Sequence, residues 1–169
     1  MSMLRSEIIS IKSVSQLHQW NGSESPTHPL ISVIDVSQTE ILEEHVGIRS
    51  CSDLYVIGLK DMSCGNQYGR NHYDFDEGVL FFYAPNQVQT IVRAYQKGEV
   101  KGWMIVSHPD LIRNTQLGKT IDTYNFFNYS VFEALHISEA EQATLIDCME
   151  LIKREIAERV DNHSQMVIA

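Results

Sequence analysis

Three carboxylates stand close together in the middle of the chain and are of a type that could perform acid–base chemistry. Asp74, Asp76 and Glu77 precede Gly78, and carboxyl groups held at different pKa values are common general acids and bases. Acidic residues beside a glycine are also the ordinary composition of a solvated turn, which we expect here. The chain contains no G-x-S-x-G, no P-loop and no G-x-G-x-x-G, so it has no motif for a nucleophilic serine or a bound phosphate.

The histidines give a partial match to a metal-binding pattern. Small metal-binding barrels of the cupin kind read G-x5-H-x-H-x3-4-E-x6-G, with a further histidine in a later motif. Here His72 is followed by Asp74 in the second histidine position, Glu77 is wrongly spaced, and the later histidine is absent. Three neutral nitrogen donors on one ion are therefore not expected, and we predict no metal and no cofactor.

The two relevant histidines have simpler interpretations. His72 has the position of an ordinary polar residue on a strand. His108 comes directly before Pro109, and an imidazole there commonly hydrogen-bonds the turn.

Aromatic and long apolar side chains could instead line a small-molecule pocket, because such pockets are mostly apolar with a few convergent polar groups. Arg70 is the polar candidate, since a partly buried guanidinium can clamp a carboxylate or phosphate. Its pairing with Asp74 or Glu77 is an equally open alternative. Strand alternation turns only half of the side chains inward, and the sequence leaves the register open. The candidate lining residues are Tyr55, Arg70, Tyr73, Phe82, Trp103 and Met104.

The overall composition is that of an acidic globular protein. The chain has 169 residues, 43% of them hydrophobic, with 13 Lys and Arg against 22 Asp and Glu, hence a net charge of −9. That balance disfavours contact with a phosphate backbone by this chain. No apolar run reaches the ~18 residues of a membrane span, and Glu7 and Lys12 interrupt any signal peptide. We expect a soluble cytoplasmic domain without a membrane partner.

Short strand-like segments separated by turn residues fill the chain from about 30 to 135. The segment 79–84 is apolar on both faces, so we expect it to be covered on both sides. A short helix is predicted over 13–20, ended by Asn21-Gly22, while 37–50 has no firm assignment. The predicted strands are 30–36, 54–60, 79–84, 88–95 and 100–108. The pattern favours a mainly β, α+β domain built on a β-barrel or jelly roll.

The C-terminal part predicts a long helix. Ser138 and Glu141 form an S-x-x-E capping box that opens a helix running to about Val160. Its apolar residues form one stripe, which could pack on the chain's own barrel or form a helix–helix dimer contact. The stripe contains Leu145, Cys148, Met149, Ile152 and Ile156.

The last residues predict a further helix. Asp161-Asn162 has the composition of a new cap, and apolar residues follow it to the end. We therefore interpret the chain as a fragment that stops within this helix. The predicted division is a barrel with its short helix over 1–137 and a helical layer over 138–169.

Four blocks in order carry a family resemblance. They read HPLISVID (28–35), YGRNHYDFDEGVLFFYAPNQ (68–87), GWMIVSHPDLIRNTQLGK (102–119) and YNFFNYSVFEALHISEAE (124–141). Together they resemble the N-terminal domain of AraC-type transcriptional regulators over nearly the whole chain. The departures are Asn86, where a glycine is usual, and Ser107, where an aromatic residue is common.

The resemblance implies a function as well as a fold. A cupin-like barrel followed by helices would sense a small-molecule effector or mediate homodimerisation, through a dimer layer that includes 138–160. A second domain with two helix-turn-helix units, absent from this chain, would bind DNA. The alternative from a different class is a metal-dependent cupin enzyme, an isomerase or dioxygenase.

Overall fold

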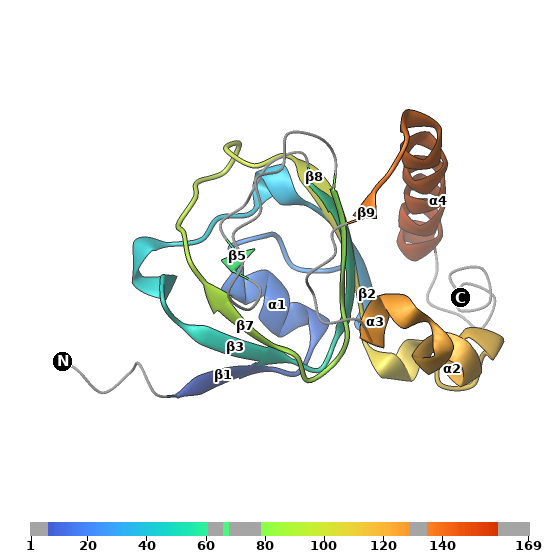
Figure 1. Ribbon diagram of the computed structural model, residues 1–169, viewed down its shortest axis with the longest axis horizontal. Helices are drawn as coiled ribbons and strands as arrows, with labels where there is room; N and C mark the ends of the chain where they lie inside the picture. Colours follow the sequence, from blue (N-terminus) through green and yellow to red (C-terminus); the bar gives the residue numbers. More distant parts are fainter. Residues whose placement is uncertain (1–6, 61–65, 68–78, 129–134, 159–169) are drawn as a thin grey trace.

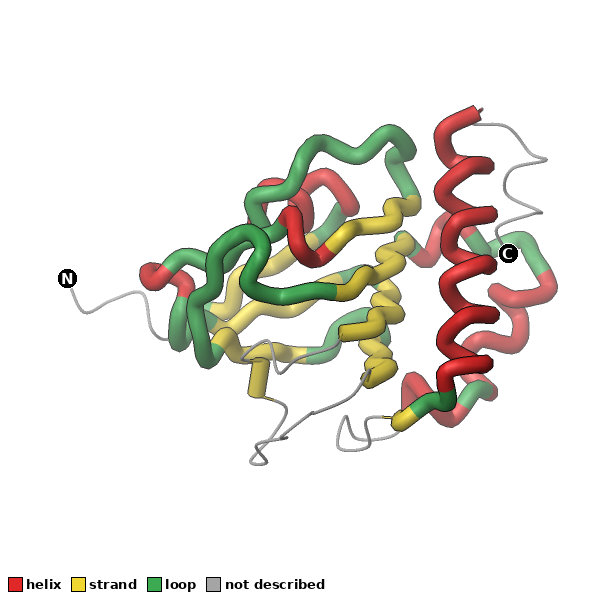
Figure 2. Tube along the Cα trace, turned by 90° about the horizontal axis from the view of Figure 1, so that it is seen from above, coloured by secondary structure: helices red, strands yellow, loops and turns green. Residues whose placement is uncertain are grey.

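Two β-sheets and a layer of helices make up the protein (Figures 1 and 2). The computed structural model describes residues 7–60, 66–67, 79–128 and 135–158. The helical layer lies against one face of the larger sheet, and the smaller sheet lies on the other side (Figure 1). The larger sheet is thus the middle layer, with apolar clusters on both of its faces.

The larger sheet is antiparallel throughout. Its register pairs Met104 with both Ile34 and Gly58, so these three residues share one face. Its strands, in spatial order, are β2 (Ile31–Asp35), β8 (Gly102–Ser107), β4 (Tyr55–Lys60), β6 (Val79–Tyr83) and β9 (Leu135–His136).

The smaller sheet joins the start of the chain to its middle. Strand β1 runs parallel to β3, and the remaining pairs are antiparallel. Its spatial order is β1 (Ile8–Ile11), β3 (Arg49–Ser52), β7 (Val88–Ile91) and β5 (Asn66–Gln67).

Helix α1 (Val14–Trp20) lies between the two sheets (Figure 1). The Ser13 hydroxyl accepts a hydrogen bond from the Gln16 N–H and caps its first turn. Asn21 ends the helix, and Gly22 follows with a φ of 67°, a conformation that glycine adopts without strain. The helix predicted over 13–20 is therefore confirmed. Val14 is fully buried in the core between the sheets.

Short helices and one long helix cover the other face of the larger sheet. They are α2 (Gln116–Thr120), α3 (Asn125–Asn128) and α4 (Glu139–Glu158). The buried residues of this second core are Ile31, Leu111, Ile112, Ile121 and Ile156. The segment 79–84 is therefore covered on both faces, as its apolar pattern predicted. One face packs in the core between the sheets, and the other packs under the layer of helices.

The predicted capping box of α4 is confirmed. The Ser138 N–H and hydroxyl both donate to Glu141 Oε2, at 2.8 and 2.7 Å, and the Glu141 N–H donates to the Ser138 hydroxyl at 3.3 Å. These bonds to the ionised carboxylate lower the pKa of Glu141. The box therefore fixes where the helix begins.

The apolar stripe of α4 faces the chain's own sheet. Met149 and Ile156 are buried, Ile152 packs into the second core, and Leu145 is half-buried. Cys148 departs from the stripe and is exposed. Intramolecular packing thus covers most of the stripe. Two large apolar residues of the helix, Ile146 and Leu151, are exposed in this chain.

The architecture agrees with the prediction of an α+β, mainly β fold. The described strands form two sheets rather than one closed barrel. The segment without an assignment, 37–50, forms two 3-10 turns (Val36–Gln38 and Glu43–His45) before β3. The predicted strand 88–95 ends at Ile91, and beyond it Tyr95 bridges to Ile41. The second helix predicted after 161 lies outside the described residues. None of the described helices has the length and apolar character to cross a membrane.

Candidate functional site

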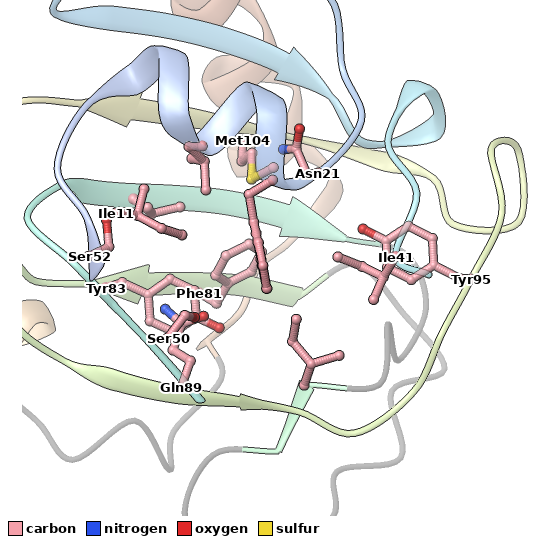
Figure 3. A pocket seen from close by; sticks show the side chains of 14 residues that line it. Ile11, Asn21, Ile41, Ser50, Ser52, Phe81, Tyr83, Gln89, Tyr95 and Met104 are labelled. Atoms are coloured by element: carbon pink, nitrogen blue, oxygen red, sulfur yellow. The ribbon is translucent and has the colours of Figure 1, made fainter. Parts of the chain in front are cut away.

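A small cavity lies between the two sheets, beside helix α1 (Figure 3). Its volume is about 100 Å³. Cavities that bind small molecules are enclosed mainly by apolar side chains with a few polar groups, and this one has that composition. Its lining consists of Ile11, Leu17, Trp20, Asn21, Ile41, Ser50, Ser52, Val56, Phe81, Tyr83, Gln89, Ile91, Tyr95 and Met104.

Three structural units contribute to this lining. The larger sheet contributes alternate residues of three adjacent strands, for example Val56 and Met104, since every second side chain points inward. The smaller sheet contributes polar side chains, among them Ser50 and Gln89. Helix α1 contributes its last turn. The cavity therefore exists only when both sheets and the helix are assembled.

Asn21 is the most informative polar residue of the cavity. It is 4% exposed, and its Oδ1 accepts two hydrogen bonds from Ser23, from the N–H at 3.2 Å and from the hydroxyl at 2.6 Å. Its Nδ2 is buried and has no hydrogen-bond acceptor among the described residues. A buried donor without an acceptor loses its hydrogen bonds to water without replacement, so native proteins rarely contain one without a reason.

Tyr95 is held at one side of the cavity by a buried hydrogen-bond chain. The Thr39 hydroxyl donates to the Val36 carbonyl at 2.7 Å, so the Tyr95 hydroxyl donates to Thr39 Oγ1 across 3.0 Å. The backbone adds two bonds, since Ile41 and Tyr95 exchange N–H···O contacts of 2.9 and 3.0 Å. The ring of Tyr95 is thereby positioned against the cavity before any ligand binds.

The Trp20 ring forms another part of the wall and is supported from outside. It stacks on His45, with ring centroids 4.4 Å apart and an angle of 19° between the planes. His45 lies in the 3-10 turn Glu43–His45, which precedes β3. This stack links α1 to the turn that precedes β3.

Of the predicted lining residues, Met104 contributes to the cavity. Tyr55 and Phe82 lie on the opposite face of the larger sheet, where Tyr55 packs edge-on against Phe127 at 5.2 Å and Phe82 stacks on Phe126 at 5.1 Å. Burial, followed by the charge of Asp122, raises the pKa of Tyr55.

Trp103 also lies on the helix-facing side, because it alternates with Met104 along β8. Its Nε1 is buried without a partner in the part of the chain that the structure describes. Arg70 and Tyr73 lie outside the described residues, as do Asp74, Glu77 and His72. The predictions for these residues therefore stay predictions.

Several lining residues were not foreseen from the sequence. Asn21 and Trp20 belong to a helix end that the sequence shows only as a helix–stop signal. Ser50 is the last residue of the segment without a sequence assignment, and Ser52 lies between that segment and the predicted strand 54–60. An isolated serine on a half-buried strand carries no signal of its own, because only the pairing of the two sheets turns it toward a cavity.

A second, larger cavity of about 570 Å³ lies between helix α4 and the segment that follows α1. Both signs of charge line it, with Glu24 and Asp35 as acids and Lys97 and Lys153 as bases. It is a polar crevice where the helical layer meets the edge of the larger sheet.

His18, a residue of α1, is buried and its side chain lines this crevice. Its Nδ1–H donates to the Glu24 carbonyl, so its Nε2 accepts from the Ser32 hydroxyl, 3.0 Å away. Burial lowers the pKa of His18, partly offset by the bond to Glu24. The ring therefore connects α1 to strand β2 in its neutral form.

In the described part of the chain, no three His, Cys, Asp or Glu side chains lie close enough together to bind one metal ion. His108 forms the turn contact expected of it, since its Nδ1 accepts from the Asp110 N–H at 3.2 Å. It caps the 3-10 turn that begins at Pro109.

Comparison with protein-family models found no match to this chain. Comparison with curated proteins found none either.

Proposed function

We propose that this chain is the sensory domain of a regulator of the AraC type, which binds a small effector between its two sheets. The carrying observation is the cavity beside α1, which has an apolar wall and an amide donor without an acceptor among the described residues. The two facing sheets are compatible with a cupin-like jelly roll. In this proposal DNA is bound by a separate domain, in keeping with a net charge of −9. A transcriptional regulator works in the cytoplasm.

Connected contacts lead from the cavity to the helical layer. Leu17 and Trp20 of α1 line the cavity, together with Asn21, which caps the end of the helix. From the same helix His18 contacts Ser32 of β2, and the neighbouring Ile31 shares the second core with Ile156 of α4. If α1 has two arrangements, a ligand that binds one of them more tightly shifts the equilibrium toward it. The size of the shift equals the difference between the two binding free energies.

Homodimerisation is part of the proposal. In α4 the exposed apolar side chains are Ile146 and Leu151, which leaves them available for contact with a second copy. In this proposal the effector alters the association or relative position of two copies by changing the seating of α4 on the sheet.

A thermal-shift screen of small metabolites tests the proposal. A ligand at 100 times its dissociation constant stabilises the folded state by about 2.7 kcal/mol, which gives a clear rise in melting temperature. Hits should lose their effect in the cavity-filling variant Val56→Phe, while Asn125→Leu, at an exposed position of α3 away from the cavity and from α4, should keep it. If Val56→Phe does not fold, Ser50→Val offers a change of similar volume in the same cavity.

Two results would overturn the proposal. The first is a screen in which every stabilising ligand acts equally on the native chain and on the cavity variants. The second is stoichiometric Fe, Mn, Ni or Zn in protein purified without chelators, accompanied by turnover of a substrate, which would favour the cupin enzyme instead.

A further inference from the structure

We propose that the ligand of the cavity between the sheets is a small uncharged molecule with an oxygen acceptor, which accepts a hydrogen bond from Asn21 Nδ2. This inference rests on the proposed function, because it names the chemical class of the effector. It depends on three observations: the orientation of the Asn21 amide, the absence of charged side chains among the described lining residues, and the size of the cavity.

The orientation of the amide is set by Ser23. Asn21 Oδ1 accepts from both the N–H and the hydroxyl of Ser23. The reversed amide would turn an NH2 group toward a backbone N–H, and two donors cannot bond each other. The amide oxygen is therefore committed to Ser23, and the nitrogen is directed toward Met104 (Figure 3).

The nitrogen is the group that lacks a partner. It is buried, and the described residues offer it no acceptor. Met104, beside it, belongs to the cavity lining, and methionine is unbranched and adapts its shape to a neighbouring group. A ligand oxygen at this point would supply the missing acceptor, while the Met104 side chain makes room for it.

The lining sets the charge of the ligand. Among the described residues, 14 side chains line the cavity, and none of them is an Asp, Glu, Lys, Arg or His. An ion that enters this lining loses its hydration, and the described side chains supply no opposite charge in return. That loss costs far more free energy than burying a neutral polar group. Carboxylates and amines are thereby disfavoured, whereas ketones, amides and alcohols fit.

The volume sets its size. A cavity of roughly 150 Å³ accommodates benzene, and this cavity measures about 100 Å³. By that comparison the ligand has on the order of four to six non-hydrogen atoms.

Three probes of six non-hydrogen atoms each test the inference on the native chain: cyclopentanone, its hydrocarbon counterpart methylenecyclopentane, and the anion cyclopropanecarboxylate. Titrations of 15N-labelled protein give the affinities and report directly on the Asn21 side-chain amide. We expect cyclopentanone to shift that amide signal and to bind at least tenfold more tightly than the other two. The variant Asn21→Leu should bind cyclopentanone and methylenecyclopentane equally. The matched control Asn125→Leu, at an exposed asparagine of α3, should keep the native preference.

Each contrary outcome has a distinct meaning. Equal affinity of the native chain for cyclopentanone and methylenecyclopentane would overturn the role of Asn21, while the cavity remained a binding site. Tighter binding of the carboxylate would overturn the uncharged class. Binding without any shift of the Asn21 amide signal would overturn the contact even if Asn21→Leu failed to fold. Failure of all three probes would overturn this inference alone, whereas the proposed function fails on the metabolite screen or on metal-dependent turnover.

Discussion

The ring of Phe81 lies over Gly58, its partner across strands β6 and β4, and fills the space that a Cβ at position 58 would need. Phe81 also lines the cavity between the sheets. The glycine therefore allows an aromatic wall to sit close to the backbone of the larger sheet. The absence of one side chain at position 58 shapes the cavity.

Gly58→Ala should displace the Phe81 ring. Because the new methyl group overlaps the ring, we expect a loss of about 1–3 kcal/mol in the free energy of unfolding, typical of an overpacked core. Ligand binding should weaken as well, since the ring can relax only by moving into its surroundings. Urea denaturation and effector titration measure the two effects.

The double variant Gly58→Ala/Phe81→Leu supplies the control. If the ring is the obstacle, Gly58→Ala should cost clearly less stability in the Phe81→Leu background. Additive losses in the double variant would show that the ring does not limit position 58.

Stability should fall as the pH drops below about 6.5. Burial lowers the pKa of both His18 and His28, and His28 Nδ1 accepts from the Leu30 N–H, which a protonated ring cannot do. Above pH 6.5, the ordinary value for histidine, both states are neutral and these groups have no effect. Below it the unfolded chain takes up protons first, so stability declines until the pH reaches the lowered pKa values of the folded state.

Urea midpoints between pH 7.5 and pH 5 measure this decline. We expect His18→Gln to flatten it, because one of the two responsible groups is removed. Gln116→Ala, which changes a side chain that does not titrate at an exposed position of α2, should leave the decline as in the native chain. An identical decline in native chain and His18→Gln would contradict a role for His18.

The packing of α4 on its own sheet predicts unequal costs along the helix. Ile156 is 7% exposed and belongs to the second core, so Ile156→Ala should cost about 2–5 kcal/mol. Leu151 is 47% exposed, and Leu151→Ala should change stability by less than about 0.5 kcal/mol. Chemical denaturation of the two variants measures the difference, and equal costs would contradict this packing.

The exposed residue Leu151 also addresses dimerisation. Sedimentation of the native chain and of Leu151→Glu at high concentration should show weaker association of the variant if the exposed face of α4 meets a second copy. Association that does not change with Leu151→Glu would contradict contact through this face.

Gly118→Ala should destabilise the protein although alanine is the better helix former by about 1 kcal/mol. Gly118 lies in α2, where a Cβ would overlap the backbone carbonyl of Ile112. Because that neighbour is backbone, it cannot rotate away, and α2 or the preceding turn must shift. We expect a lower melting temperature for Gly118→Ala and no appreciable change for Gln116→Ala, an exposed position of the same helix. A rise with Gly118→Ala would contradict the close approach.

Local signals in the sequence accounted for the elements whose causes are local. The Ser138–Glu141 box and the Asn21-Gly22 stop act through hydrogen bonds and dihedral preferences within a few residues. Strand 30–36 was predicted from its Ile and Val content and appears as β2 (Ile31–Asp35). The segment 79–84 is apolar on both faces, and this pattern correctly predicted that other elements pack on both of them.

The face on which a side chain lies needed the tertiary structure. Tyr55 and Val56 are adjacent in the sequence and similarly apolar, yet Val56 lines the cavity and Tyr55 packs under the helices. Adjacent residues of a strand point to opposite faces of the sheet. Which of the two faces the cavity depends on the register of β4 against β6 and β8.

The sequence by itself determined the mainly β class, the helix ends and the acidic charge of this protein, because these follow from composition and from interactions between near neighbours. Only the tertiary structure decided that α1 lies between the sheets and that Asn21, which follows the helix, lines a cavity with an amide donor that has no acceptor among the described residues. The physical reason is that a cavity belongs to no segment. It is the space left when segments far apart in the chain pack together, and its shape depends on all of them at once.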